Sequence, residues 1–273
     1  MNRLIDILKM DEIELKNYLY DYLLEKNMQP IYENGFLYAK GNIPILLVAH
    51  MDTFFSILPN EIVYDEKNDM IYSDNGALGG DDRCGVYAIM NILEKYKPHV
   101  LFTDDEEIGG LGAREAVRKI EKPDVKYIIE FDRKGSNDCV FYDCDNSRFI
   151  KYIQSFGFKL DFGSFSDICI LSDAWKIASV NLSSGYYNEH TFNEYIKFNE
   201  LTNNINRVKH MLDNVNRVKY FKYREITLNN NTFDVYEDKF LELLNMYIKQ
   251  FDSTGYVKKL TFEDNENNFR GDR

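Results

Sequence analysis

The sequence predicts an α/β protein, a three-layer α/β/α sandwich with a mixed, largely parallel central sheet. Two observations predict this fold class. Short apolar runs typical of buried strands alternate along the chain with longer segments of helical periodicity. Acidic residues or histidines follow three of these runs, and ligand sites collect beyond the carboxyl ends of strands in such sheets. The alternation also predicts helices on both faces of the sheet.

The first 50 residues predict two helices, a turn and a buried strand. Apolar residues recur at helical spacing between residues 3 and 26, so we expect two amphipathic helices there. Asn34-Gly35 is a turn signal between two short extended runs. The continuous apolar run Ile45–Val48 is typical of a buried strand, and it ends two residues before His50.

The rest of the predicted core continues the alternation. Glycines at positions 76, 79 and 80 predict a flexible turn. We then expect, in order, a helix at 82–96, a strand at 100–102, a helix at 113–120, a strand at 127–129 and a helix at 201–215. The two strands lead to the pair Glu106-Glu107 and to Asp132.

We expect a single catalytic domain over residues 1–273. Its core covers about residues 30–220 and follows the N-terminal helices at 3–26. The extension at 224–273 has no assigned role. Within it, residues 235–251 predict a helix and residues 263–273 a frayed polar tail.

Composition excludes several classes of partner. The net charge of −12 and an isoelectric point near 4.9 argue against nucleic acid and anionic membrane surfaces, because both need a basic footprint. No apolar segment approaches the roughly 18 residues that span a bilayer, and the acidic N-terminus does not resemble a signal peptide. The four cysteines form no CxxC pair, so we expect reduced thiols in a cytoplasmic protein.

Five potential metal ligands occur at or near the ends of predicted elements: His50, Asp81, Glu107, Asp132 and His190. Each alone has a plain structural explanation. A strand-end histidine can be merely hydrogen-bonded, Asp81 or Asp82 can cap a helix, and the acidic run that holds Glu107 can be a solvated turn. These explanations would have to hold five times over, so the set predicts a metal site. We assign the other two histidines, His99 and His210, to structure.

The spacing around these residues suits two cations. Residues two apart on a strand share a face, so the Asp52 carboxylate can hold the imidazole of His50. Asp81 follows two glycines that allow a sharp turn, and its two oxygens can bridge two cations. Glu106 and Glu107 are adjacent and diverge, so one can bind metal while Glu106 acts as general base towards a water.

The ligand chemistry narrows the choice of cation. Three carboxylate ligands and a hydroxide balance the charge of two divalent cations. Oxygen and imidazole ligands without thiolate suit zinc, with cobalt(II) or manganese as alternatives. We therefore expect two divalent cations per chain.

These residues resemble the co-catalytic zinc metallopeptidase clan, which contains the aminopeptidase-like families M20, M28 and M42. The pattern His-x-Asp, Asp, Glu-Glu, Asp and a late His occurs in full and in order over roughly residues 30–200. The matching motifs are His50-Met51-Asp52-Thr53 and residues 104–109 for M20, Asp81-Asp82-Arg83 for M42, and residues 163–167 and 180–184 for M28.

The resemblance implies a role for each residue. His50 and Asp132 would bind one metal, Glu107 and His190 the other, and Asp81 both. Asp52 would orient His50, Glu106 would be the general base, and the bond between Asp81 and Asp82 would be cis.

The chain is shorter than some members of the clan. Family M42 inserts a domain before the bridging Asp, and family M20 often inserts a dimerising lid domain before the last His. Neither spacing here leaves room for such an insert, so we expect a bare catalytic domain nearest M28 in architecture. Its oligomeric state stays open, because the usual interface-forming insert is missing.

Amide hydrolysis is the expected chemistry, with short peptides as substrates of an aminopeptidase or a di- or tripeptidase. One alternative is a deacylase acting on N-acyl amino acids or similar small amides. Another is a metal-binding module without catalysis, although an intact Glu106 speaks against it. Asp167 could hold a free amino terminus or simply cap a turn. Arg133, Lys134 and Arg148 could hold a terminal carboxylate or be solvated surface charges.

Overall fold

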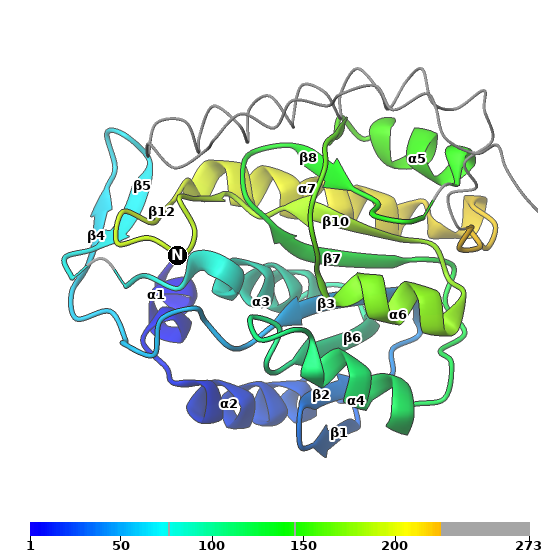
Figure 1. Ribbon diagram of the computed structural model, residues 1–273, viewed down its shortest axis with the longest axis horizontal. Coiled ribbons are helices and arrows are strands. Elements are labelled where there is room, and N and C mark those ends of the chain that lie inside the picture. The colour runs from blue at the N-terminus through cyan, green and yellow to red at the C-terminus, as the bar shows by residue number, and fades with distance from the viewer. Residues whose placement is uncertain (76, 145, 225–273) are drawn as a thin grey trace, which may run out of the picture. The chain divides into compact units, whose positions relative to one another are not determined.

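Eight strands form the main sheet, in the order β1-β2-β6-β3-β7-β10-β8-β9 (Figure 1). The computed structural model describes residues 1–75, 77–144 and 146–224. The strands are β1 Pro30–Glu33, β2 Phe36–Ala39, β3 Ile43–His50, β6 Pro98–Thr103, β7 Ile128–Arg133, β8 Asp138–Val140, β9 Lys159–Leu160 and β10 Ser179–Ser183. The strands from β6 to β10 in this order pair in parallel, and β1, β2 and β8 join antiparallel to their neighbours nearer the centre. The sheet is therefore mixed and largely parallel at its centre, as predicted.

Helices cover both faces of this sheet. The first group comprises α1 Asn2–Leu8, α2 Glu12–Glu25, α3 Gly80–Leu93, α5 Ser147–Gln154 and α7 Phe198–Asp213. The second comprises α4 Leu111–Lys119 and α6 Asp167–Trp175, which lie side by side. A short 3-10 helix, Val215–Arg217, follows α7.

Alternate residues of the buried strands feed two separate apolar cores. On β3, Leu47 and Ala49 join the core with the first group of helices, whereas Leu46 and Val48 join the core with the second group. Side chains along a strand point to opposite faces in turn, so a strand covered on both sides is apolar throughout. This is the three-layer sandwich that the sequence predicts.

The elements predicted within the described residues occur with small shifts at their ends. The two N-terminal helices are α1 and α2, and Asp11 caps α2 by accepting a hydrogen bond from the backbone N–H of Glu14 at 2.8 Å. Asn34 and Gly35 turn the chain between β1 and β2, with Gly35 at φ 99°. The predicted strands at 45–48, 100–102 and 127–129 are the centres of β3, β6 and β7.

A second, four-stranded sheet is absent from the prediction. Its strands are β4 Ile62–Asp65, β5 Met70–Ser73, β11 Tyr186–Tyr187 and β12 Tyr195–Ile196, in the order β11-β12-β5-β4. Tyr195 pairs with Tyr72 across it. Strands of two to four residues show no readable periodicity, so only their pairing reveals them. This sheet ties the segment before Asp81 to the loop that carries His190.

Residues Met1–Ile226 form one compact unit. The helix predicted at 235–251 and the polar tail at 263–273 lie outside the described residues, as does almost all of the extension at 224–273. In the described part of the chain, no helix combines the length and the apolar character needed to cross a membrane. Cys84, Cys139, Cys144 and Cys169 are thiols, and no disulfide joins any two of them.

Candidate metal centre

Five elements deliver the predicted ligands to one edge of the main sheet. His50 ends β3 and Asp132 lies near the end of β7. Glu107 follows β6, Asp81 lies in the first turn of α3, and His190 lies in the loop between β11 and β12. Parallel strands end at the same edge of a sheet, so residues far apart in sequence meet here.

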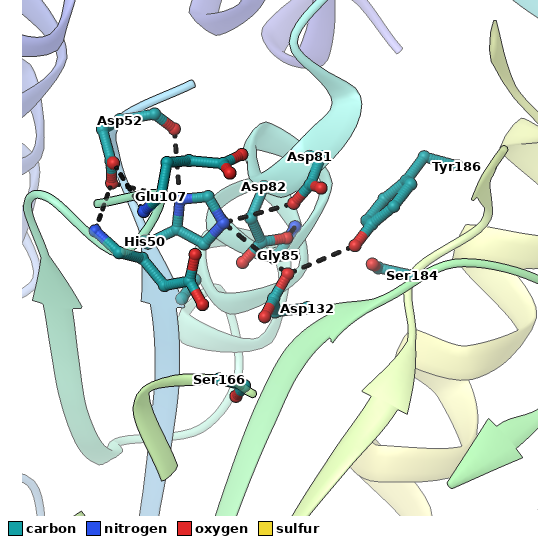
Figure 2. Close-up of polar contacts among 12 residues, drawn as sticks. His50, Asp52, Asp81, Asp82, Gly85, Glu107, Asp132, Ser166, Ser184 and Tyr186 are labelled. Atoms are coloured by element: carbon teal, nitrogen blue, oxygen red, sulfur yellow. Dashed lines mark hydrogen bonds and ion pairs between the residues drawn. The ribbon is translucent and has the colours of Figure 1, made fainter. Parts of the chain in front are cut away.

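The two oxygens of Asp81 face two different imidazoles. Oδ1 lies 3.2 Å from Nε2 of His50, and Oδ2 lies 3.1 Å from Nε2 of His190 (Figure 2 shows the first pair). Asp132 Oδ1 is 3.6 Å from the His50 nitrogen, and Glu107 Oε1 is 2.9 Å from the His190 nitrogen. The side chains thus form two groups of three that share Asp81.

Each group has the dimensions of a cation site. One potential ligand atom each from His50, Asp81 and Asp132 lie within 4.8 Å of one another, and the same holds for Asp81, Glu107 and His190. The partition into two groups is the one that the family resemblance implies.

Asp52 connects His50 to the loop after β6. Its carboxylate Oδ1 lies 3.2 Å from Nδ1 of His50, on the far side of the ring from Asp81. Its two oxygens also accept hydrogen bonds from the backbone N–H groups of Glu106 and Glu107, each at 3.1 Å. One buried carboxylate therefore positions an imidazole and both adjacent glutamates.

Asp81 and Asp82 divide two roles that the sequence left open. Asp82 Oδ1 accepts a hydrogen bond from the backbone N–H of Gly85 at 2.8 Å, so Asp82 caps the regular part of α3 and Asp81 is left to face the imidazoles. The peptide bond between the two is cis, as the resemblance implies. A side chain at position 85 would meet Asp82 and the Phe131 carbonyl oxygen at 2.3 Å, so only glycine fits there.

Glu194 is a site residue that the sequence analysis did not identify. Its carboxylate accepts hydrogen bonds from the backbone N–H groups of Gly79, at 2.8 Å, and Asp81, at 2.9 Å. Only 5% of the residue is exposed. Gly79 has φ 73°, which a glycine adopts at low cost, and this turn aims both N–H groups at one carboxylate. The sequence signal that could have identified Glu194 is its position four residues after the candidate ligand His190.

Asn181 and Tyr186 support Asp132. The Asn181 side chain accepts from the backbone N–H of Asp132 at 2.9 Å and donates to its carbonyl oxygen at 2.8 Å. The Tyr186 hydroxyl donates to Asp132 Oδ1 at 3.2 Å (Figure 2). Residues 180–184, which form one of the motifs shared with family M28, lie on and just after β10. This strand pairs with β7, so the motif lies beside Asp132.

A cavity of about 120 Å³ opens beside these ligands. Glu106 lines it together with Glu107, Asp132 and His190. Burial, followed by the nearby Asp132 carboxylate, raises the pKa of Glu106 to about 9, and burial raises the pKa of Asp132 to about 7. Crowded, buried carboxylates of this kind suit cations, because a nearby positive charge favours the ionised form.

The candidate carboxylate-binding residues fall into two groups. Arg133 and Lys134 both line the cavity, and they pair with Asp161 and Glu189, each at 2.5 Å. Arg148 lines a separate hollow and not this one.

The structure contradicts a contact between substrate and Asp167. This residue begins α6, is fully buried, and its carboxylate accepts a hydrogen bond from the Thr103 hydroxyl, so it is held inside the fold. The alternative, a turn-capping role, is not seen either, because no side-chain cap hydrogen bond forms at the start of α6 and the Asp167 carboxylate binds Thr103 on β6 instead.

The two remaining histidines lie outside both ligand groups and contact other residues of the fold. His99 is buried and shares a 2.9 Å hydrogen bond with the Tyr38 hydroxyl. His210 lies on α7 with its ring at the edge of Phe156, 5.7 Å between centroids.

No protein-family model matches the chain, and no curated protein matches its sequence. Solved structures do match. A tripeptidase from Staphylococcus aureus superposes with a TM-score of 0.66 at 14% identity, over 80% of this chain and 98% of that one. Aminopeptidase PepT from Bacillus cereus gives 0.61 at 15%, over 79% and 97%. A leucine aminopeptidase precursor from Bacteroides thetaiotaomicron gives 0.57 at 15%, over 78% and 94%. The chain therefore has the fold of these peptidases, the fold that the resemblance implied.

Proposed function

We propose that this chain is a two-metal hydrolase that removes residues from short peptides, as an aminopeptidase or a di- or tripeptidase. The observation that carries the proposal is the pair of three-residue groups sharing Asp81, beside a cavity lined by Glu106. The names of the similar structures, tripeptidase and aminopeptidase, support the substrate class.

The positions of the donor atoms support one arrangement of two cations. His50 and Asp132 would bind one cation, Glu107 and His190 the other, and Asp81 both, since its oxygens face opposite groups. Imidazole and carboxylate ligands fit zinc, with cobalt(II) or manganese as alternatives. When bound, two such cations would acidify a shared water and polarise the carbonyl of the scissile bond.

The protein's own side chains would move the proton and hold the geometry. Glu106 would take a proton from the attacking water and return it to the leaving amine. Asp52 would hold His50 through the Nδ1 atom of the imidazole. It would also keep Glu106 in place by accepting a hydrogen bond from the backbone N–H of Glu106. The small cavity would favour short substrates over folded proteins.

A deacylase of N-acyl amino acids is the second candidate. Arg133 and Lys134 line the cavity. The guanidinium of Arg133 or the ammonium of Lys134 would bind the carboxylate that such a substrate carries. A C-terminal carboxylate of a dipeptide or tripeptide would use the same groups, so the two functions differ in the group at the amino end.

Peptide cleavage followed by mass spectrometry tests the proposal. The full chain, reconstituted with zinc, cobalt or manganese, would meet a mixture of di-, tri- and longer peptides and N-acetyl amino acids. We expect stepwise loss of N-terminal residues. Glu106→Gln should lower turnover by about 10²–10⁴-fold while keeping fold and bound metal. Release of acetate alone would favour the deacylase, and no cleavage with any metal would contradict both.

A further inference from the structure

Exposed apolar side chains gather beside the proposed metal ligand His190. Phe54, Ile57 and Leu58 follow β3 in the chain, and Phe192 lies two residues after His190. The exposed fraction is 54% for Phe54, 60% for Ile57, 41% for Leu58 and 59% for Phe192. We call these four residues and the half-buried Phe55 the apolar patch. Adjoining exposed apolar groups mark binding surfaces, whereas scattered ones do not.

The rings of the patch form a connected series that starts at the metal centre. Phe54 stacks on the His190 imidazole, with 4.5 Å between centroids and 15° between planes. Phe55 meets Phe54 edge to face at 5.1 Å and stacks on Phe192 at 4.6 Å. Such pairs hold aromatic rings in a fixed arrangement. The three rings of the patch are therefore positioned relative to His190.

The patch and the catalytic cavity are two sides of one site. Phe54, Phe55, Ile57 and Leu58 line a small hollow together with ten other residues, among them Asp81 and His190. Asp81 and His190 also line the 120 Å³ cavity. The hollow encloses only about 20 Å³, room for about one water. A ligand side chain would therefore lie against the exposed rings rather than inside the protein.

The two sides differ in chemistry. The cavity is mainly polar: Arg133, Lys134 and Glu189 line it, together with Phe165 and two tyrosines. The five patch residues present apolar side chains, and polar groups such as Asp81 and Glu194 line the same hollow. A peptide held at the ligands by its scissile carbonyl would meet mostly polar groups on the cavity side and the apolar side chains of the patch on the other. Burying an apolar side chain against those rings removes apolar surface from water on both partners.

We propose that the apolar patch binds a bulky apolar side chain next to the scissile bond, so that the preferred substrates are short peptides with Leu, Phe or a similar residue there. This inference rests on the proposed function. Phe192 is the specificity-determining residue that can be changed most cleanly, because it is exposed and has no contact with a proposed ligand in the ring series.

Kinetics on a peptide series test the inference. The residue on each side of the bond is varied in turn among Leu, Phe, Ala, Ser and Asp. We expect kcat/KM to favour Leu and Phe over Ala by about tenfold or more at one of the two positions. Phe192→Ala should remove most of that ratio, and Phe192→Leu should retain part of it. Ile13→Ala is the control, since Ile13 is 70% exposed on α2 and outside the patch.

A binding measurement separates the possible failures. Binding of the same peptides to the metal-loaded Glu106→Gln variant, by titration calorimetry, should show the same order of preference. Cleavage with equal rates for apolar and polar residues would overturn this inference and leave the proposed function standing, whereas no cleavage at all would overturn the proposed function. A wild type that sediments as a dimer and becomes monomeric on Phe192→Ala, with no change in selectivity, would assign the patch to a second copy and overturn the inference.

Discussion

The Glu194 carboxylate accepts a hydrogen bond from the backbone N–H of Asp81, with 2.9 Å between nitrogen and oxygen. Its other oxygen accepts from Gly79 at 2.8 Å. Asp81, which belongs to both candidate cation groups, is thus held through its backbone by the Glu194 side chain, which comes from the same loop as His190. That loop therefore supplies both a candidate ligand and the support for another ligand.

Replacing Glu194 should weaken metal binding and stability together. Glu194→Ala leaves the buried N–H of Asp81 and the part-buried N–H of Gly79 without their acceptor. The buried group alone should cost about 1–3 kcal/mol in the free energy of unfolding. Loss of such support lowers metal affinity by about 10–100-fold. Glu194→Gln keeps one acceptor oxygen and should fall between wild type and Glu194→Ala. Urea unfolding and zinc titration calorimetry measure both effects, and wild-type affinity in the alanine variant would contradict the role.

The shared position of Asp81 predicts an unequal pattern of metal loss. Asp132→Asn should weaken only the cation on the His50 side, and His190→Ala only the other, because each residue belongs to one group. Asp81→Asn should weaken both. His210→Ala is the control and should retain two ions. The number of zinc ions per chain after dialysis, by elemental analysis, checks this pattern, and two ions retained by Asp81→Asn would exclude a bridging role.

Much of the main sheet and its ligands could be predicted from the sequence. Strands β3, β6 and β7 are buried on both faces, so each is a continuous apolar run. The site follows because His50 and Asp132 lie at the ends of such runs. The family resemblance added the partition of the ligands into two groups, which local pattern alone does not contain.

The remaining features depend on contacts between distant residues. The small sheet consists of strands of two to four residues, and β12 pairs with β5 more than 120 positions earlier. Glu194 is separated from Gly79 by 115 positions. The stack of Phe54 on His190 likewise joins two loops. No periodic pattern or short spacing in the sequence indicates that these residues contact each other, so the contacts could not be predicted from it.

Glu94 predicts a loss of stability in acid that has no connection with the metal centre. Its carboxylate contacts Lys26 and Arg3, each at 2.6 Å, and so links the first three helices. The hydrogen bond from Lys26, followed by those from Arg3 and Tyr22, lowers the pKa of Glu94 to about 2 from 4.5. A lowered folded-state pKa adds stability above the unfolded value, and this stability disappears as the pH falls through the folded value.

The difference in unfolding free energy between wild type and Glu94→Gln should therefore be largest above pH about 5 and vanish near pH about 2. Urea unfolding of both proteins across this range measures it. The carboxylate is 43% exposed, so 1 M salt should reduce the difference at neutral pH by screening. A difference independent of pH would show that the ion pairs contribute nothing.

Asp52 should affect both metal binding and turnover, because it contacts His50 and the base loop at once. Its two oxygens each accept one backbone N–H, from Glu106 and Glu107, at 3.1 Å. Asparagine has one acceptor oxygen, so Asp52→Asn sets an NH₂ group against one of these donors and moves the loop. We expect kcat to fall by about tenfold or more, because a small misplacement of a general base is costly. Metal affinity should fall by about 10–100-fold as His50 loses its charged partner.

Asp105→Asn is the matched control, since it makes the same change in the same loop at a residue outside both ligand groups. Asparagine also tolerates the positive φ of 58° at position 105. That variant should retain wild-type affinity and kcat. If Asp52→Asn did so as well, the carboxylate would be a structural link between two strands and not a support of the metal centre. If both variants lost activity alike, the effect would belong to the charge of the loop and not to the contacts of Asp52.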